Sequence, residues 1–167
     1  MKEVGLRYAV VAAFLMIIVF LVSYYIGVHP FIEMSHLFFD FFIYGLVIYF
    51  ALNEFKTVNS EGILHFWQGM SIGFFVNIFS FGIYMVFLFL IMNFDENILI
   101  SYQQQAVDFL EVKSAQYIEG YGEEQYQIQV ETIQETTILD MALMGGVKKF
   151  ISAMLITPVL SILKRKT

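Results

Sequence analysis

Long apolar segments dominate the chain and alternate with shorter polar stretches. The clearest of them covers residues 63–94, which hold no charged side chain before Asp95. An α-helix of this length, at about 1.5 Å of rise per residue, is longer than the ~30 Å hydrocarbon core of a bilayer. Residues 1–167 are expected to form a single membrane domain. We therefore predict an all-α, polytopic membrane protein with four transmembrane helices, over about residues 8–28, 37–53, 66–93 and 144–163.

Between the third and fourth apolar segments, residues 95–140 are strongly acidic. They hold ten acidic residues and one basic residue, Lys113, and so carry a net charge of −9. Apolar residues recur at helical spacing on both sides of residues 120–122, where two glycines predict a turn. We predict an acidic helical hairpin over residues 95–140, on the extracytoplasmic side of the membrane. Its charge argues against nucleic acid as a partner, because phosphate groups would be repelled.

The distribution of lysine and arginine predicts the orientation of the helices. If both termini lie in the cytoplasm, six basic residues face the cytoplasm, and Lys113, Lys148 and Lys149 lie outside. This arrangement satisfies the positive-inside rule, and the reverse arrangement does not. We therefore expect a multi-pass protein of the bacterial inner (cytoplasmic) membrane, with both termini cytoplasmic.

Small and polar residues recur at intervals of three to four along three of the predicted helices. Such strips allow two helices to approach closely in a membrane, as in the Gly69-x-x-x-Gly73 pattern. Asn77 is expected to form an interhelical hydrogen bond, with a role in lining a pore as the alternative. Ser60 is expected to cap the third helix. We expect helix packing through Gly5, Ala9, Ala13, Gly69, Gly73, Asn77, Ala153, Thr157 and Ser161.

One face at the start of the second helix carries ionisable residues. Glu33, His36 and Asp40 are three and four residues apart, so a helix places them on one side. A carboxylate and an imidazole one turn apart are weak candidates for a metal site, which normally needs further ligands from other helices. The alternative is that water at the outer mouth of the helix solvates these side chains.

Two ionisable residues fall at similar depth inside the predicted transmembrane segments. Asp40 lies in the second helix and Lys149 in the fourth. An unpaired charge is costly in hydrocarbon, so we predict an intramembrane ion pair between Asp40 and Lys149, with Lys148 as the alternative partner. A further alternative is that each side chain reaches interfacial water by itself.

Motifs for catalysis are absent from the sequence. There is no cysteine, which excludes disulfides and thiolate metal sites. No glycine-rich phosphate loop, serine–histidine–acid set or His-Glu-x-x-His motif occurs. The sequence therefore predicts a protein that is not an enzyme and that has no cofactor.

Three segments carry a resemblance to a known family. They are Gly-Ile-Leu-His-Phe-Trp-Gln-Gly-Met at residues 62–70, Ala-Gln-Tyr-Ile-Glu-Gly-Tyr-Gly-Glu-Glu-Gln at residues 115–125, and Ile-Ser-Ala-Met-Leu at residues 151–155, which leads to the basic residues 164–166. Together they resemble an uncharacterised, domain-of-unknown-function family of four-span bacterial inner-membrane proteins, common in Bacteroidetes-type bacteria. The resemblance implies a helical insertion between the third and fourth helices, and it brings no established activity and no functional residues.

These expectations favour a non-catalytic accessory, scaffold or assembly component of the membrane. The lipid bilayer would surround the four helices, and the acidic hairpin would be presented to a membrane or extracytoplasmic protein partner. Self-association into a homo-oligomer, through the Gly69/Gly73 or the Gly5/Ala9/Ala13 strip, is a further expectation. The alternative is a small transporter or channel that uses a polar path from Glu33, His36, Asp40 and Asn77.

Overall fold

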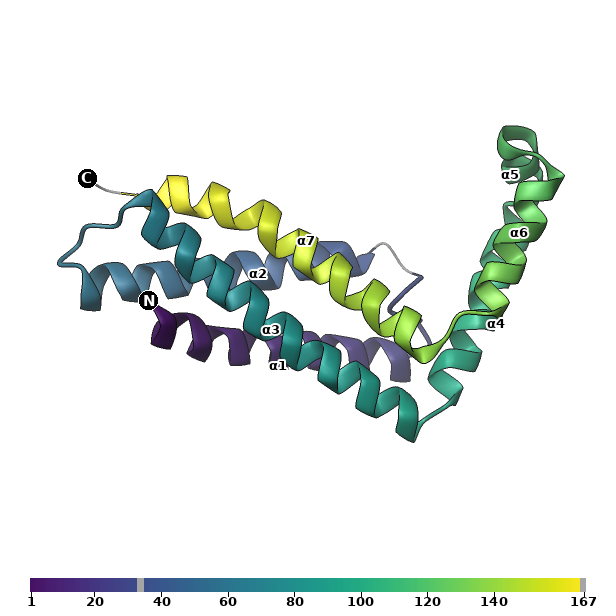
Figure 1. The fold of residues 1–167 in the computed structure, drawn as a ribbon, viewed down its shortest axis with the longest axis horizontal. Helices are drawn as coiled ribbons and strands as arrows, with labels where there is room; N and C mark the ends of the chain where they lie inside the picture. Colours follow the sequence, from purple (N-terminus) through teal and green to yellow (C-terminus); the bar gives the residue numbers. More distant parts are fainter. Residues whose placement is uncertain (33–34, 166–167) are drawn as a thin grey trace.

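The fold is built from helices throughout the part of the chain that the structure describes. This structure, a computed structural model, describes residues 1–32 and 35–165. Four long helices lie side by side in a bundle, and three short helices form an arm at one end of it (Figure 1). The long helices are α1 (Lys2–Tyr25), α2 (Ser35–Glu54), α3 (Phe66–Phe94) and α7 (Ile138–Lys164). The arm contains α4 (Asn97–Val112), α5 (Ser114–Tyr121) and α6 (Glu123–Gln134), and a π-helical turn, η1 (Phe55–Asn59), follows α2.

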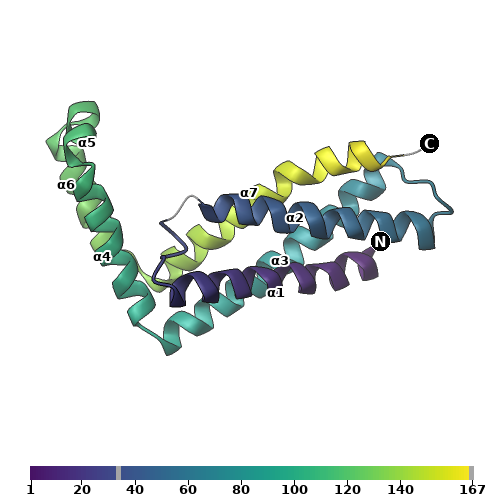
Figure 2. The same cartoon turned by 180° about the vertical axis from the view of Figure 1, so that it is seen from behind.

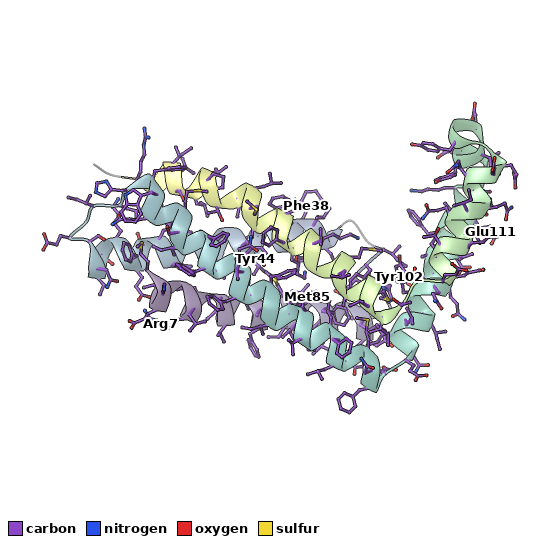
Figure 3. The ribbon with its side chains drawn as sticks, viewed as in Figure 1. Arg7, Phe38, Tyr44, Met85, Tyr102 and Glu111 are labelled. Carbon is purple, nitrogen blue, oxygen red and sulfur yellow. The ribbon has the colours of Figure 1, made fainter. Side chains whose placement is uncertain are left out.

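The four long helices are long and apolar enough to cross a membrane. Large apolar side chains remain exposed along the outside of the bundle, among them Phe14, Phe38 and Phe89. Figure 3 shows Phe38 on the outside of the bundle. Water would disfavour an apolar surface of this extent, whereas lipid accommodates it. The prediction of an all-α protein with four apolar membrane helices is therefore confirmed for the described residues, among which no strand occurs.

The four long helices pack around α3. This helix packs along α7 and along α1, and α2 packs mainly against α7 and α1. Both ends of the chain lie at the end of the bundle where α2 is joined to α3, while the arm leaves from the opposite end (Figure 1 and Figure 2). The bundle therefore has one end that carries the termini and another that carries the arm.

Small residues allow α1 to approach α3 closely. Ala9 and Ala13 are fully buried in the interior face of α1. At Gly5, an added Cβ would lie 2.6 Å from the Cβ of Phe75 in α3, which is closer than real Cβ atoms come. The strip of small residues on α1 therefore faces the inside of the bundle.

A second strip of small residues lies between α3 and α7. A Cβ added to Gly69 would lie 2.9 Å from the Cβ of Ser161, and one added to Gly73 would collide with Thr157. Ala153 continues the buried strip on α7. Because helices of the same chain occupy both strips, a second copy would have to pack against another surface of the bundle.

Polar contacts close the end of the bundle that carries the termini. Arg7 of α1 and Glu54 of α2 form an ion pair, and Tyr8 Oη donates a hydrogen bond to Glu54 Oε2 at 2.9 Å. Lys56 Nζ donates a hydrogen bond to the carbonyl oxygen of Lys164 at 3.1 Å. These contacts join α1 to α2, and η1 to α7, where the apolar stretches of the long helices end.

The start of α3 differs from the prediction. Ser60 does not cap this helix: His65 does, and Gln68 Oε1 accepts a hydrogen bond from the His65 backbone N–H at 2.9 Å. Glu61 and Gly62 have positive φ angles of 49° and 85°, so the chain turns between Ser60 and the helix. The glycine allows this turn, and the helix can begin only after it.

α7 begins before the predicted transmembrane segment, at Ile138 instead of near residue 144. Thr137 caps it, because the Thr137 hydroxyl accepts a hydrogen bond from the Asp140 backbone N–H at 3.2 Å. The Asp140 carboxylate in turn accepts one from the Thr137 backbone N–H at 3.0 Å, which completes a capping box. The 27 residues of α7 are about 40 Å long, more than the hydrocarbon core requires.

The arm is a helical hairpin in which α4 and α6 pack against each other and α5 forms the tip (Figure 1). It turns away from the bundle and runs across the direction of the four long helices, as Figure 2 also shows. α5 continues through Tyr121, so Gly122 alone, with a φ of 89°, makes the turn that was predicted over residues 120–122. Ala106, Leu110 and Ile133 are among the buried residues of α4 and α6, and Tyr102, at the base of the hairpin, packs against the rings of His29 and Phe31.

Candidate functional site

An ion pair is buried in the bundle between Asp40 of α2 and Lys149 of α7. Lys149 Nζ lies 2.5 Å from Asp40 Oδ1, and the two residues are only 7% and 5% exposed. The Lys149 ammonium group also lies 4.6 Å from the ring centroid of Tyr84 in α3, a cation–π contact. The structure thus brings together the two residues that the sequence analysis pairs, and three helices meet around them.

The neighbouring lysine, Lys148, has a different partner. Its Nζ donates a hydrogen bond to the carbonyl oxygen of Phe31 at 3.1 Å. Successive residues of a helix project about 100° apart, so adjacent lysines reach different groups. Lys148 therefore joins α7 to the segment that follows α1, and Lys149 is the lysine that pairs with Asp40.

Further polar contacts lie deeper in the bundle. The hydroxyl groups of Tyr44 in α2 and Ser80 in α3 are 3.1 Å apart, and Ser80 Oγ donates a hydrogen bond to the carbonyl oxygen of Asn77 at 3.0 Å. Asn77 Nδ2 donates to the carbonyl oxygen of Phe150 in α7 at 3.2 Å. Asn77 Oδ1 is buried without a hydrogen-bond partner among the described residues. Asn77 therefore links α3 to α7 and keeps one unsatisfied acceptor in the interior.

A small cavity lies beside the ion pair. Its volume is about 20 Å³, and its lining includes Asp40, His36, Tyr84 and Lys148. A space of this size holds about one water molecule and cannot hold a metabolite. The polar groups at this site therefore interact mainly with one another, through the ion pair and hydrogen bonds, and not with a bound solute.

The structure tests the proposed metal ligands only in part, because Glu33 lies outside the described residues. His36 and Asp40 both line the small cavity, and the Asp40 carboxylate is already bound by Lys149. Within residues 1–32 and 35–165, no three histidine, aspartate or glutamate side chains come close enough to hold a metal ion. The arrangement of the described residues is that of a buried ion pair.

His29 is a buried polar residue that the sequence pattern does not single out. It is 2% exposed and follows α1, and its Nε2 donates a hydrogen bond to the carbonyl oxygen of Ile98 in α4 at 3.0 Å. Its Nδ1 accepts one from the Phe31 backbone N–H at 3.4 Å. These two contacts require the neutral imidazole, and burial lowers the pKa of His29 by more than the bond to Ile98 raises it. His29 thereby fixes the base of the hairpin to the bundle.

Comparison with known proteins identifies the family. Residues 7–166 match a family model described as "Protein of unknown function (DUF4199)". No curated protein and no solved structure gives a match. The matched region includes the four long helices and the insertion between α3 and α7, so the resemblance to a domain-of-unknown-function family is confirmed over nearly the whole chain. The chain is therefore an integral membrane protein of unknown role, and it belongs to the DUF4199 family.

Proposed function

We propose that this protein is a non-catalytic accessory or assembly component of the bacterial inner membrane. In this role the bundle anchors the chain, and the acidic hairpin is presented outside the cytoplasm to a partner protein with a basic surface. The observation that carries the proposal is the large, exposed and unneutralised negative charge of the hairpin.

The carboxylates of the hairpin face solvent without cationic partners. In the part of the chain that the structure describes, the ion pairs are Arg7–Glu54 and Asp40–Lys149, and neither lies in the hairpin. Exposed carboxylates that lack counter-charges attract a partner of opposite charge and increase its rate of association. The exposed acidic residues of α4, α5 and α6 are Asp108, Glu111, Glu119, Glu123, Glu124 and Glu131.

The position of the hairpin also supports a role in binding. It extends from the end of the bundle, and most of its length has no neighbouring helix except its own partner helices (Figure 1). An arm with little contact to the rest of the chain contributes little to the stability of the bundle. An exposed arm of this kind is available to bind another molecule.

The orientation in this proposal follows from the basic residues. Lys2, Arg7, Lys56, Lys164 and Arg165 lie at the end of the bundle that carries the termini, and they fit the cytoplasmic side by the positive-inside rule. Lys113, in the hairpin, lies toward the other side. We therefore propose that both termini lie in the cytoplasm and that the hairpin lies outside it.

The transport alternative has less support from the geometry. A polar path from His36 and Asp40 toward Asn77 would need space for a solute, whereas the cavity beside Asp40 holds about one water molecule. The carboxylate of Asp40 is already engaged by Lys149. An accessory role requires neither a path nor a free charge, so we favour it.

Neutralising the hairpin tests the proposal. A variant with Glu111→Gln, Glu124→Gln and Glu131→Gln should lose about tenfold in affinity for the co-purifying partner, because each exposed charge pair contributes roughly 0.2–1 kcal/mol. High salt should weaken the complex in the same way. The measurement is quantitative co-purification in mild detergent, followed by titration of the identified partner.

A variant with Gln104→Ala and Gln127→Ala, which changes exposed hairpin residues without changing charge, serves as the control and should bind normally. Equal binding of the neutralised variant and the unmodified protein would contradict the proposal. Finding no protein above the background of empty membranes would contradict it as well.

A further inference from the structure

The direction in which the hairpin extends indicates how it lies relative to the membrane surface. The hairpin leaves the end of the bundle and runs across the direction of α1, α2, α3 and α7 (Figure 1 and Figure 2). Helices that cross a bilayer stand roughly along its normal, with moderate tilts. An arm that runs across them at one end therefore extends along the surface of the same bilayer, beside the bundle.

One side of the hairpin faces back toward the bundle. A groove is lined by Phe31 and Ile32, which follow α1, together with residues of all three hairpin helices, including Phe109, Tyr117 and Gln129. Figure 3 places Tyr102 on this side of the hairpin and Glu111 on the opposite side. We call this side the inner face, and it comprises Tyr102, Phe109, Lys113, Tyr117, Gln125 and Gln129.

Helix geometry separates the inner face from the carboxylates. At about 100° per residue, Phe109 lies within about 20° of Tyr102 around α4, whereas Glu111 lies about 180° away. Lys113 directly follows α4 and joins the inner face through the contact of its Nζ with the ring of Phe109. On α6, Gln125 lies about 40° from Gln129, which is in the groove.

The carboxylates of α6 follow the same rule. Glu131 lies about 200° from Gln129, and Glu124 about 140° from it, so both point away from the bundle. We call this opposite side, with Glu111, Glu124 and Glu131, the outer face. Three of the six exposed carboxylates of α4, α5 and α6 thus point away from the side that faces the bilayer.

The chemistry of the inner face suits the headgroup layer. Phe109 is 50% exposed, and Lys113 Nζ lies 4.1 Å from the centroid of its ring. Aromatic rings are favoured at the membrane–water interface, and a lysine there attracts anionic lipid headgroups. Lys113 is the single basic residue of the acidic segment 95–140. On the inner face, the positive charge of Lys113 attracts anionic lipid headgroups, which would repel carboxylates at the same position.

We propose that the inner face of the hairpin binds the headgroup layer of the bilayer in which the bundle lies. The hairpin rests on the membrane through Phe109, Tyr117 and Lys113, and it turns its outer face to solution. This inference goes beyond the proposed function, because it concerns the opposite face of the hairpin and needs no protein partner.

The absence of cysteine from the chain permits a direct test. Gln125→Cys and Gln127→Cys place one spin label on the inner face and one on the outer face, two residues apart on the same helix. Both positions are exposed glutamines, so each is the matched control of the other. The purified protein is placed in nanodiscs of phosphatidylethanolamine with phosphatidylglycerol, and collisions of each label with a water-soluble nickel chelate are measured.

The label at residue 125 is expected to be shielded from the nickel chelate and accessible to oxygen dissolved in lipid, whereas the label at residue 127 is freely accessible from water. Lys113→Gln should weaken the membrane-bound state about fivefold, which raises the exposure of the label at residue 125. Equal accessibility of the two labels in the unmodified background would overturn the proposal. Since no partner protein is present in the nanodiscs, this outcome is independent of the test of the proposed function.

Discussion

Asp40→Asn should destabilise the protein by about 3–5 kcal/mol, because it leaves the Lys149 ammonium group buried without its counter-charge. The two side chains are almost fully buried, and Lys149 Nζ lies 2.5 Å from Asp40 Oδ1. Lys149→Met should destabilise by a similar amount, since it leaves the carboxylate unpaired. The double variant should recover most of the loss, because it removes both charges together. Thermal unfolding of the four proteins in mild detergent measures the coupling.

The exposed pair at the other end of the bundle provides the control for this cycle. The Arg7 side chain is 65% exposed, so Arg7→Gln and Glu54→Gln should each cost at most about 1 kcal/mol and show weak coupling. Strictly additive losses of stability for Asp40→Asn and Lys149→Met would contradict a stabilising interaction between the two side chains.

Gly73→Ala should cost about 1–3 kcal/mol, because its Cβ would collide with Thr157 where α3 and α7 are in close contact. The contact has little freedom to relax, since Thr157 Oγ1 is buried and donates a hydrogen bond to the carbonyl oxygen of Ala153 at 2.6 Å. Gly82→Ala is the matched control on the same helix. An added Cβ there meets nothing within 4 Å, and alanine favours the helix over glycine, so this variant should be neutral or slightly stabilising. Equal effects of the two substitutions on thermal stability in detergent would contradict close packing of α3 against α7 at Gly73.

Much of the architecture follows from local properties of the sequence. The apolar runs predict the four long helices because the cost of burying polar groups in lipid restricts a span to apolar residues in helical form. The acidic composition of residues 95–140 marks the insertion for the same reason, since carboxylates cannot remain in hydrocarbon. The pairing of Asp40 with a lysine of α7 is also foreseeable, because both fall at a depth where an isolated charge is costly.

Other features depend on tertiary contacts that a sequence pattern does not contain. The choice of Lys149 over Lys148 depends on the rotation of α7, and the pattern leaves both possible. The contact of His29 with Ile98 joins residues 69 positions apart, so no local signal predicts it. The direction of the hairpin depends on residues 94–97 and on the turn before Ile138, where a small change in backbone angles would move the whole arm.

The start of α3 shows how a local rule can be overridden. Ser60 has the chemistry of a helix cap, yet the positive φ angles of Glu61 and Gly62 turn the chain, and His65 takes the capping position. Several residues before α3 have side chains that can cap a helix. The turn at Glu61 and Gly62 determines which residue takes the capping position. Capping preference by itself therefore predicts that this helix exists, but it does not predict at which residue the helix begins.

We propose that the two ends of the bundle face opposite sides of the membrane, with the hairpin outside the cytoplasm. Asn59→Cys, in η1, and Glu119→Cys, in the hairpin, test it directly, because the chain has no other cysteine. In right-side-out spheroplasts, a membrane-impermeant maleimide should label residue 119 at once and residue 59 only after the membrane is permeabilised. Labelling of residue 59 alone in intact spheroplasts would reverse the orientation, and equal labelling of both residues would contradict the four-span bundle.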